Sequence, residues 1–398
     1  MVRQSVARKL GSVYSTKQWF IEYNGNLSNH LAHGVIALEH LGASDDRIQE
    51  FVQVYEQRTK LRPAENVLQE ADQRLNIKQF ERGLVGARRN FYGLQEFYAQ
   101  AFAENGRDQV IREYLPQTLR GMSGALLHNM IHLGYGYRSQ AEHIVLEGMA
   151  YMHHSCLPLA KSIDEFTERT ISSSLSSSQA PTASFDEFVD SFITSMNRMR
   201  SEGKITDLLQ TRCHEADDWS NSRPQNQLRL ISLHGIELLD DLTRDIPLTP
   251  SISWYVDLLI KVLVETTYVR ETGKDAQYDF VLLHGATCSW ALHQLEHLVD
   301  ARYAQYCLAN TLFAVLAIQG IPHLEFCEIH QTHAPWEELL PALVARDLDE
   351  HAYKLGAVAH ERFLSCDANC PGELYKQACS IVTHLGSTLQ PVQSFSSL

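Results

Sequence analysis

A lysine close to a histidine is the first place in this sequence where the residue types suggest chemistry. His351 and Lys354 stand three residues apart, in a segment that we predict to be helical. Residues at this spacing lie one turn apart on the same side of a helix. An unpaired ammonium group that is buried either costs on the order of several kcal/mol or loses its proton. A lysine on a buried helix face therefore indicates a functional site.

The helix expected to carry His351 has an apolar stripe that extends on both sides of it. The members of this stripe are Leu340, Val344, Leu348, Leu355 and Val358. Apolar residues that recur in this way form one face of a helix. His351 falls on this face and Lys354 lies beside it, so both side chains are expected to point into the protein.

Three other histidines occupy similar positions on other predicted helices, and His284 has the clearest setting. Steps of about 100° per residue place it on the face that also carries Cys288 and Leu295. His284 is therefore expected to point inward. The same steps place His293 and His297 on the opposite face, where we expect them to be exposed.

His128 is expected within a helix that begins near Gly121. It shares a face with Gly121 and Gly124, and glycines there would let another backbone approach closely. His132 follows one turn later on the same face. Either both histidines bind one ion together, or one binds it while the other contacts a substrate.

His30 lies at the start of a further predicted helix. The apolar stripe of this helix comprises Leu27, Leu31, Val35 and Leu38. His30 flanks the stripe, whereas His33 and His40 point away from it. We therefore prefer His30 as the inward-facing residue.

These assignments give one inward-facing histidine on each of four helices. A single buried histidine is more often a core residue whose ring nitrogens find backbone or carboxylate partners. Four of them from four helices are instead typical of metal sites inside helical bundles. We predict a buried metal site formed by His30, His128, His284 and His351.

Lys354 has three alternative roles in such a site. Burial near a cation would lower the pKa of its amine, and the neutral amine could then bind the metal. The amine could also take up carbon dioxide as a carbamate, whose oxygens would act as a carboxylate ligand. In the third alternative the side chain extends to solvent and pairs with Asp347 or Glu350.

The elements that must position these residues are helical. Helical periodicity dominates the chain, as in the apolar positions Ile48, Phe51, Val52 and Tyr55 that follow a capping candidate at Ser44. Alternating patterns typical of strands are hard to find. We predict an all-α fold with the metal site in its helical core.

A serine-rich segment near residues 171–184 divides the chain, and we expect it to be a flexible, exposed loop. His30 and His128 precede this segment, and His284 and His351 follow it. If the four meet, both halves share one core. We therefore predict a single large helical domain over residues 1–398.

Composition excludes several classes of partner. The chain has 398 residues with 34 basic and 48 acidic side chains, a net charge of -14. It contains no basic run suited to nucleic acid or anionic lipid. No apolar stretch approaches a membrane span, and the segment after Met1 lacks the apolar core of a signal peptide. We expect a cytoplasmic protein without nucleic-acid or membrane partners.

Several short motifs together resemble those of a known family. They occur in order over most of the chain, and they are Asn29–His33, Leu41–Ala43, His128, Ile131–Tyr135, Leu283–Thr287 and Asp349–Lys354. In these segments the chain is similar to the questin oxidase-like family of secondary metabolism. This family includes oxygenases that carry out Baeyer-Villiger-type oxidation or ring cleavage of aromatic polyketides.

The resemblance implies a non-haem iron oxygenase that uses dioxygen on an aromatic polyketide such as an anthraquinone. It implies that the four histidines bind iron (Fe2+), with Lys354 or its carbamate as a further ligand. NADPH is an electron source that the resemblance suggests, although we find no GxGxxG after a strand and assign no residues to it. His132, Tyr135 and His33 are candidates for binding or deprotonating a phenolic substrate.

Two other functions remain as alternatives. The same site could activate water in a metal-dependent hydrolase, although the chain has no HExxH segment. The protein could also be a non-catalytic helical binding protein with an apolar pocket. Metal identity separates the first alternative from an oxygenase, and absence of stoichiometric metal would favour the second.

Overall fold

The computed structural model describes most of the chain. The described residues are 2–24, 27–70, 85–86, 88, 91–172, 183–215, 220, 222–271, 280–320, 333–346, 349–365 and 372–385. Most of the serine-rich segment lies outside them, as do Leu348 of the predicted apolar stripe and Asp347, one of the two expected partners of Lys354.

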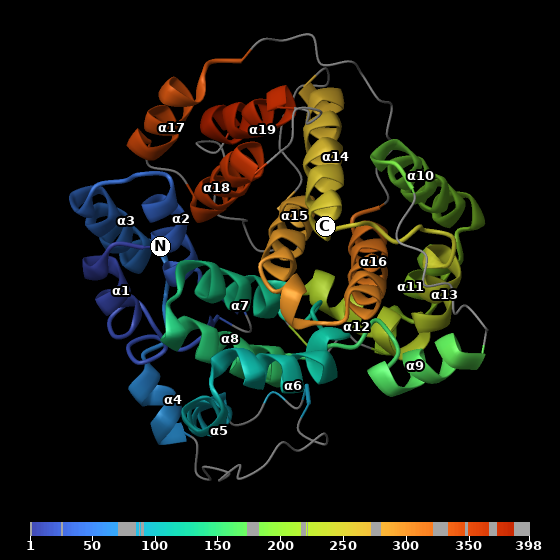
Figure 1. The fold of residues 1–398 in the computed structure, drawn as a ribbon, viewed down its shortest axis with the longest axis horizontal. Coiled ribbons are helices and arrows are strands. Elements are labelled where there is room, and N and C mark those ends of the chain that lie inside the picture. The colour runs from blue at the N-terminus through green and yellow to red at the C-terminus, as the bar shows by residue number, and fades with distance from the viewer. Residues whose placement is uncertain are drawn as a thin grey trace.

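Helices make up almost all of the regular structure (Figure 1). Before the serine-rich segment they are α1 (Gln4–Leu10), α2 (Leu31–His40), α3 (Asp45–Arg58), α4 (Ala64–Glu70), α5 (Phe91–Asn105), α6 (Arg107–Leu119), α7 (His128–Ser139), α8 (Glu142–His154) and α9 (Ile163–Ser172). After it they are α10 (Phe185–Glu202), α11 (Lys204–Thr211), α12 (Arg223–His234), α13 (Ile236–Thr243), α14 (Ser253–Glu271), α15 (Phe280–His293), α16 (Ala301–Ile318), α17 (Trp336–Ala345), α18 (Glu350–Ser365) and α19 (Gly372–Leu385). Short 3-10 helices occur at η2 (Cys213–Glu215) and η3 (Glu296–Leu298).

Within the described residues, the one sheet has two short antiparallel strands, β1 (Glu22–Tyr23) and β2 (Leu27–Ser28). The prediction of an all-α fold is confirmed. Predicted capping is confirmed in α3, where the Ser44 side chain accepts a hydrogen bond from the backbone N–H of Arg47. The predicted face of this helix, which includes Phe51 and Tyr55, is buried.

Four helices, each of which carries one of the four predicted inward-facing histidines or follows it directly, contact one another in a closed ring. α2 contacts α7, α7 contacts α15, α15 contacts α18, and α18 contacts α2 (Figure 1). Two glycines allow α7 to pack closely on its neighbours. A Cβ on Gly134 would lie 2.4 Å from the Cα of Ala291 in α15, and a Cβ on Gly148 in α8 would lie 2.4 Å from the Cα of Leu133.

Three predicted helix boundaries are wrong. The helix expected from Gly121 begins only at His128, because Ala125, Leu126 and Leu127 all adopt positive φ angles. The helix expected from Leu340 through Val358 is instead two helices, α17 and α18. Leu27 belongs to β2 rather than to the stripe of α2, and it is 43% exposed.

The close backbone approach predicted from Gly121 and Gly124 is confirmed despite the missing helix. A Cβ on Gly121 would lie 2.8 Å from the backbone nitrogen of Leu157, and a Cβ on Gly124 would lie 1.9 Å from the backbone oxygen of Ser155. Glycine is therefore needed at both positions for the chain segment after α8 to pack here.

Helices that precede the serine-rich segment contact helices that follow it, since α7 packs on α15 and α2 packs on α18. The organisation as a single domain over residues 1–398 stays a prediction. Among the described helices, none has the length and apolar character needed to cross a membrane.

Candidate metal centre

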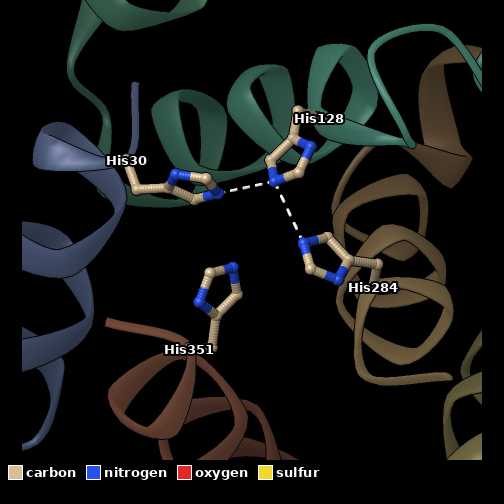
Figure 2. Close-up of side chains that lie close together, drawn as sticks. All are labelled: His30, His128, His284 and His351. Carbon is tan, nitrogen blue, oxygen red and sulfur yellow. Dashed lines mark hydrogen bonds between the residues drawn. The ribbon is translucent and has the colours of Figure 1, made fainter. Parts of the chain in front are cut away.

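Four histidines converge between the four helices of the ring, one from each (Figure 2). His30 caps the N-terminus of α2, His128 is the first residue of α7, and His351 is the second residue of α18. His284 lies in the first half of α15. All four are buried, and each offers a ring nitrogen within 4.8 Å of those of the others. The structure therefore brings these four residues together, as the sequence predicted.

The closest approaches in this group are between Nε2 atoms. Nε2 of His128 lies 2.5 Å from Nε2 of His30 and 3.0 Å from Nε2 of His284. The ring of His351 lies 4.7 Å from that of His30 and 4.9 Å from that of His284, measured between centroids. Figure 2 shows the four rings facing a common space.

The opposite nitrogen of three of these rings already has a partner. Nδ1 of His128 lies 2.6 Å from the carbonyl oxygen of Ala125, and Nδ1 of His284 lies 2.6 Å from that of Phe280. Nδ1 of His351 is bonded to the Asp349 carboxylate. Because these partners are acceptors, each Nδ1 carries the proton. In a neutral ring with its proton on Nδ1, the free lone pair is on Nε2.

Burial favours the neutral form of three of the four rings. It lowers the pKa of His30, His128 and His284 well below the ordinary value, and the neighbouring ring of His128 and the amine of Lys354 add to the effect on His30. Neutral His128 and His284 have no proton to share between their Nε2 atoms. Two lone pairs at 3.0 Å repel each other unless a cation lies beside them.

The spacing suits one ion. Two imidazole nitrogens about 2.1 Å from a metal and at right angles are about 3.0 Å apart, which is the separation between the Nε2 atoms of His128 and His284. Nε2 of His351, Nδ1 of His30 and Nζ of Lys354 are buried and have no hydrogen-bond partner among the described residues. A buried polar atom without a partner needs an explanation, and a bound ion is one explanation that would serve all three atoms.

A left-handed turn orients His128. Ala125, Leu126 and Leu127 have φ angles of 51°, 52° and 72°, a region that side-chain-bearing residues rarely occupy. The turn places the Ala125 carbonyl against Nδ1 of His128. Backbone held in such a conformation is typical of functional sites, and here it fixes which nitrogen faces the centre.

Carboxylates surround the His351 side of the centre. Asp349 also accepts a hydrogen bond from the backbone N–H of His351, and Glu350 accepts one from Arg58 at 2.7 Å. Burial opposes ionisation of Asp349, but His351 and Arg58 outweigh it and lower its pKa. Burial and the neighbouring Asp349 raise the pKa of Glu350. Asp349 and Glu350 form, with His351, another set of atoms that could hold an ion.

Lys354 is completely buried, with an exposed fraction of 0%. Burial lowers the pKa of its amine to about 8, although Glu350 and Asp349 oppose the shift. The amine also contributes to the lowered pKa values of His30, His128 and His284, so it lies within electrostatic reach of all three. The alternative in which Lys354 extends to solvent is wrong, because no part of the side chain reaches the surface.

A second histidine group lies one turn further along α2 and α7. Nε2 of His33 lies 2.9 Å from Nδ1 of His132, and Nε2 of His132 lies 3.0 Å from a carboxylate oxygen of Glu147 in α8. The ring of His33 stacks on that of Tyr135 at 5.3 Å and meets the edge of His30 at 5.5 Å. His33 is 1% exposed, so the expectation that it points away from the core is wrong.

The remaining predicted histidines lie outside the centre. His297 is exposed, as predicted, and contacts the hydroxyl of Tyr137. His293 is half-buried rather than exposed, and its ring lies 3.2 Å from Glu296. His40 is directed toward Glu361, away from the four converging rings.

Sequence reasoning did not single out Glu147 or the left-handed turn. No local pattern connects Glu147 to His132, which lies 15 residues earlier in the neighbouring helix. Asp349 carried a detectable signal, since an acidic residue two positions before a ligand histidine at a helix start can both cap the helix and orient the ring.

Comparison with known proteins identifies one family for this chain. The family model described as questin oxidase-like matches residues 27–357, which include every residue of the candidate centre from His30 to Lys354. None of the curated proteins compared with the chain matches it.

Proposed function

The chain belongs to the questin oxidase-like family, and on this premise we propose that it is an oxygenase with one non-haem iron ion. Family membership supports an oxidoreductase that acts on aromatic polyketides. The proposal adds the metal, its ligands and dioxygen as the oxidant. The proposed ligands are His30, His128, His284 and His351, with Lys354 as a further ligand.

The observation that carries the proposal is the arrangement of ring nitrogens in His128 and His284. Their Nδ1 atoms are bonded to carbonyl groups, and their Nε2 atoms face each other at 3.0 Å. A neutral histidine pair has no favourable interaction in this geometry, whereas a metal ion would accept both lone pairs. Ligand histidines commonly have their second nitrogen fixed in this way.

Charge favours a carbamate or a neutral amine at Lys354. A divalent ion bound by neutral imidazoles brings two positive charges into a buried site, and an ammonium group would add a third. A carbamate would supply a negative oxygen ligand instead. The N-termini of α2, α7 and α18, which lie at the centre, also favour negative charge.

Iron fits the donor set and the family together. Imidazole and oxygen ligands also suit zinc and manganese, so ligand type alone does not choose the metal. An oxidase needs a metal that changes oxidation state, and zinc does not. When bound here, iron would supply the activation of dioxygen for ring cleavage or Baeyer-Villiger-type oxidation of an anthraquinone-like substrate.

We place the aromatic substrate beside His33 and Tyr135. Nδ1 of His33 and the hydroxyl of Tyr135 are buried without a hydrogen-bond partner among the described residues, so both can receive a substrate group. Both nitrogens of His132 have partners. His132 would therefore act through His33 rather than touch the substrate.

Oxygen uptake tests this function directly. Iron-loaded protein should consume dioxygen in step with oxidation of a hydroxylated anthraquinone, and zinc-loaded protein should not. A monooxygenase reaction would also consume NADPH or another two-electron donor, whereas a dioxygenase reaction would not. Full turnover without dioxygen, or equal activity with zinc, would contradict the proposal and favour a hydrolase.

A further inference from the structure

The carboxylate of Glu147 is the buried charged group nearest to His132, and the metal centre does not use it. Glu147 is 0% exposed. One of its oxygens accepts hydrogen bonds from the backbone N–H and the hydroxyl of Thr16, both at 2.7 Å. The Nε2 atom of His143 lies 3.1 Å from the same oxygen. The other oxygen faces Nε2 of His132 at 3.0 Å.

These contacts define the direction of the hydrogen bond between Glu147 and His132. A backbone N–H can only donate, so the oxygen that faces Thr16 must accept. Two donors of Thr16 on one oxygen, and an imidazole nitrogen close to each oxygen, favour the ionised form of this carboxylate. An ionised carboxylate only accepts. Nε2 of His132 therefore carries a proton and donates it to Glu147.

The tautomer of His132 then defines the tautomer of His33. We take His132 as a neutral imidazole, in which protonation on Nε2 leaves a lone pair on Nδ1. Nδ1 of His132 lies 2.9 Å from Nε2 of His33, so Nε2 of His33 must be the donor of this hydrogen bond. The same hydrogen bond leaves the second nitrogen of a neutral His33 without a proton. Nδ1 of His33 is left as an acceptor.

This acceptor has no partner within the described part of the protein, although it is buried. The ring that carries it stacks on Tyr135 and touches the edge of His30. A purely structural network of this kind would be expected to satisfy its last buried atom. The chain of hydrogen bonds from Glu147 through His132 instead ends in a free lone pair beside the metal centre.

We propose that Glu147 is a positioning residue that, through His132, presents Nδ1 of His33 as a hydrogen-bond acceptor to a hydroxyl group of an aromatic substrate. The inference rests on the proposed function in that it takes the substrate to be aromatic. It narrows the substrate class to phenols that offer a hydroxyl donor at the position facing His33. A methyl ether at that position has no proton to donate.

A pair of probes that differ only in this proton tests the inference. The probes are 2-hydroxyanthraquinone and 2-methoxyanthraquinone, and binding is measured by titration without dioxygen at a pH where the phenol is protonated. The wild-type protein should bind the hydroxyl compound about tenfold more tightly, the value of one hydrogen bond. Equal affinity for the two, or no binding of either, would overturn the inference.

The substitution Glu147→Gln should reverse the tautomers of His132 and His33 without changing the size of the side chain at position 147. Its amide oxygen must still accept from the backbone N–H of Thr16, so its NH2 group would face His132 and donate. His132 would then donate to His33, and Nδ1 of His33 would carry a proton. The preference for the hydroxyl compound should disappear in this variant. His143→Gln is the matched control, because it alters the other side of the same carboxylate and should keep the tenfold preference.

The tautomers can also be read without any variant. Nitrogen-15 NMR of histidine-labelled wild-type protein should show His33 and His132 both protonated on Nε2, and protonation of His33 on Nδ1 would overturn the inference. None of these measurements requires turnover. Failure of the oxygenase proposal would appear as absent oxygen uptake with the hydroxyl preference intact, whereas failure of this inference would appear as equal binding with oxygen uptake intact.

Discussion

Two groups of buried histidines lie one helical turn apart on the same two helices, yet their hydrogen bonding differs. In the first, carbonyl oxygens hold the protons of His128 and His284 on Nδ1, so that their Nε2 atoms face each other as two acceptors. In the second, His33 donates to His132 and His132 donates to Glu147. In the first group, nitrogen lone pairs point toward one another. In the second group, every hydrogen bond is donated in the same direction, toward Glu147.

This difference indicates that the first group is suited to binding an ion and that the second group is suited to orienting side chains beside it. A buried polar network that satisfies its members stabilises a fold and orients side chains. A set of neutral rings with converging lone pairs gains no stability from its own contacts. An ion would supply the partner that the first group lacks, whereas the protein itself holds the second group as far as His33, whose Nδ1 is left for the substrate. Changes in the first group should affect metal binding and activity, and changes in the second should affect substrate binding and stability while the metal stays bound.

The largest expected effect follows from removing His128, whose Nε2 lies nearest to two other rings. His128→Ala should reduce metal affinity and oxygenase activity by more than about 100-fold, because loss of even a supporting partner of a metal ligand costs about 10 to 100-fold. Metal content after dialysis and oxygen uptake measure this. His297→Ala is the control, since His297 is exposed and should leave both values unchanged. Full metal content in His128→Ala would remove it from the ligand set.

Lys354→Ala should remove most activity and weaken metal retention, if the amine or its carbamate is a ligand. Lys354→Arg should not restore either, because the guanidinium stays protonated and cannot bind a metal. Lys354→Glu should restore part of the metal binding by supplying a carboxylate. Carbon-13 bicarbonate should give a carbamate resonance in the wild-type protein that is missing in Lys354→Ala. Undiminished activity in Lys354→Ala would contradict this role.

The stability of the metal-free protein should depend on pH through the same lysine. The folded pKa of about 8 lies below the ordinary value of 10.5, so the buried ammonium destabilises the fold below pH 8. The penalty is about 3 kcal/mol, and it disappears as the pH rises from about 8 to 10.5. Lys354→Met should therefore stabilise the metal-free protein near neutral pH. Denaturant unfolding at several pH values tests this, and equal stability of the two proteins at neutral pH would speak against a buried, unpaired amine.

The smallest effect is expected in the second group. Thr16→Val removes one hydrogen bond to Glu147 and the acceptor of the Gln95 side chain, which lies 2.6 Å from the hydroxyl. Unfolding free energy should fall by about 1 to 2 kcal/mol. Metal content should not change, because His132 keeps its carboxylate partner. Loss of metal in this variant would show that the two groups are not separable.

Periodicity in the sequence predicted the side of each helix but not the start of each helix. It placed His284 and His351 on a buried side, but α15 and the first half of α18 are buried on every side, so burial there did not depend on the pattern. It misplaced His33, because α2 begins at Leu31 and packs on more than one side, so residues off the apolar stripe are buried as well. The periodicity of apolar residues marks one buried side of a helix, so it cannot reveal a helix that is buried on every side.

Partners distant in sequence could not be predicted in the same way. Glu147 meets Thr16 and His132 only after α8 has packed against α7. The left-handed turn before His128 contains Ala125, Leu126 and Leu127, residues that normally favour helix. Tertiary contacts hold this turn, and the local sequence gives no sign of it. The ligand set was thus predictable from chemistry and spacing, whereas its orientation depends on the packed fold.

Metal analysis of protein purified without chelator or added metal tests the central claim most directly. We predict about one iron ion per chain, bound in the wild-type protein and in His297→Ala but lost from His128→Ala. Iron content that is independent of His128, or wild-type protein that contains no stoichiometric metal, would contradict the account. The four histidines would then be a buried cluster without an ion.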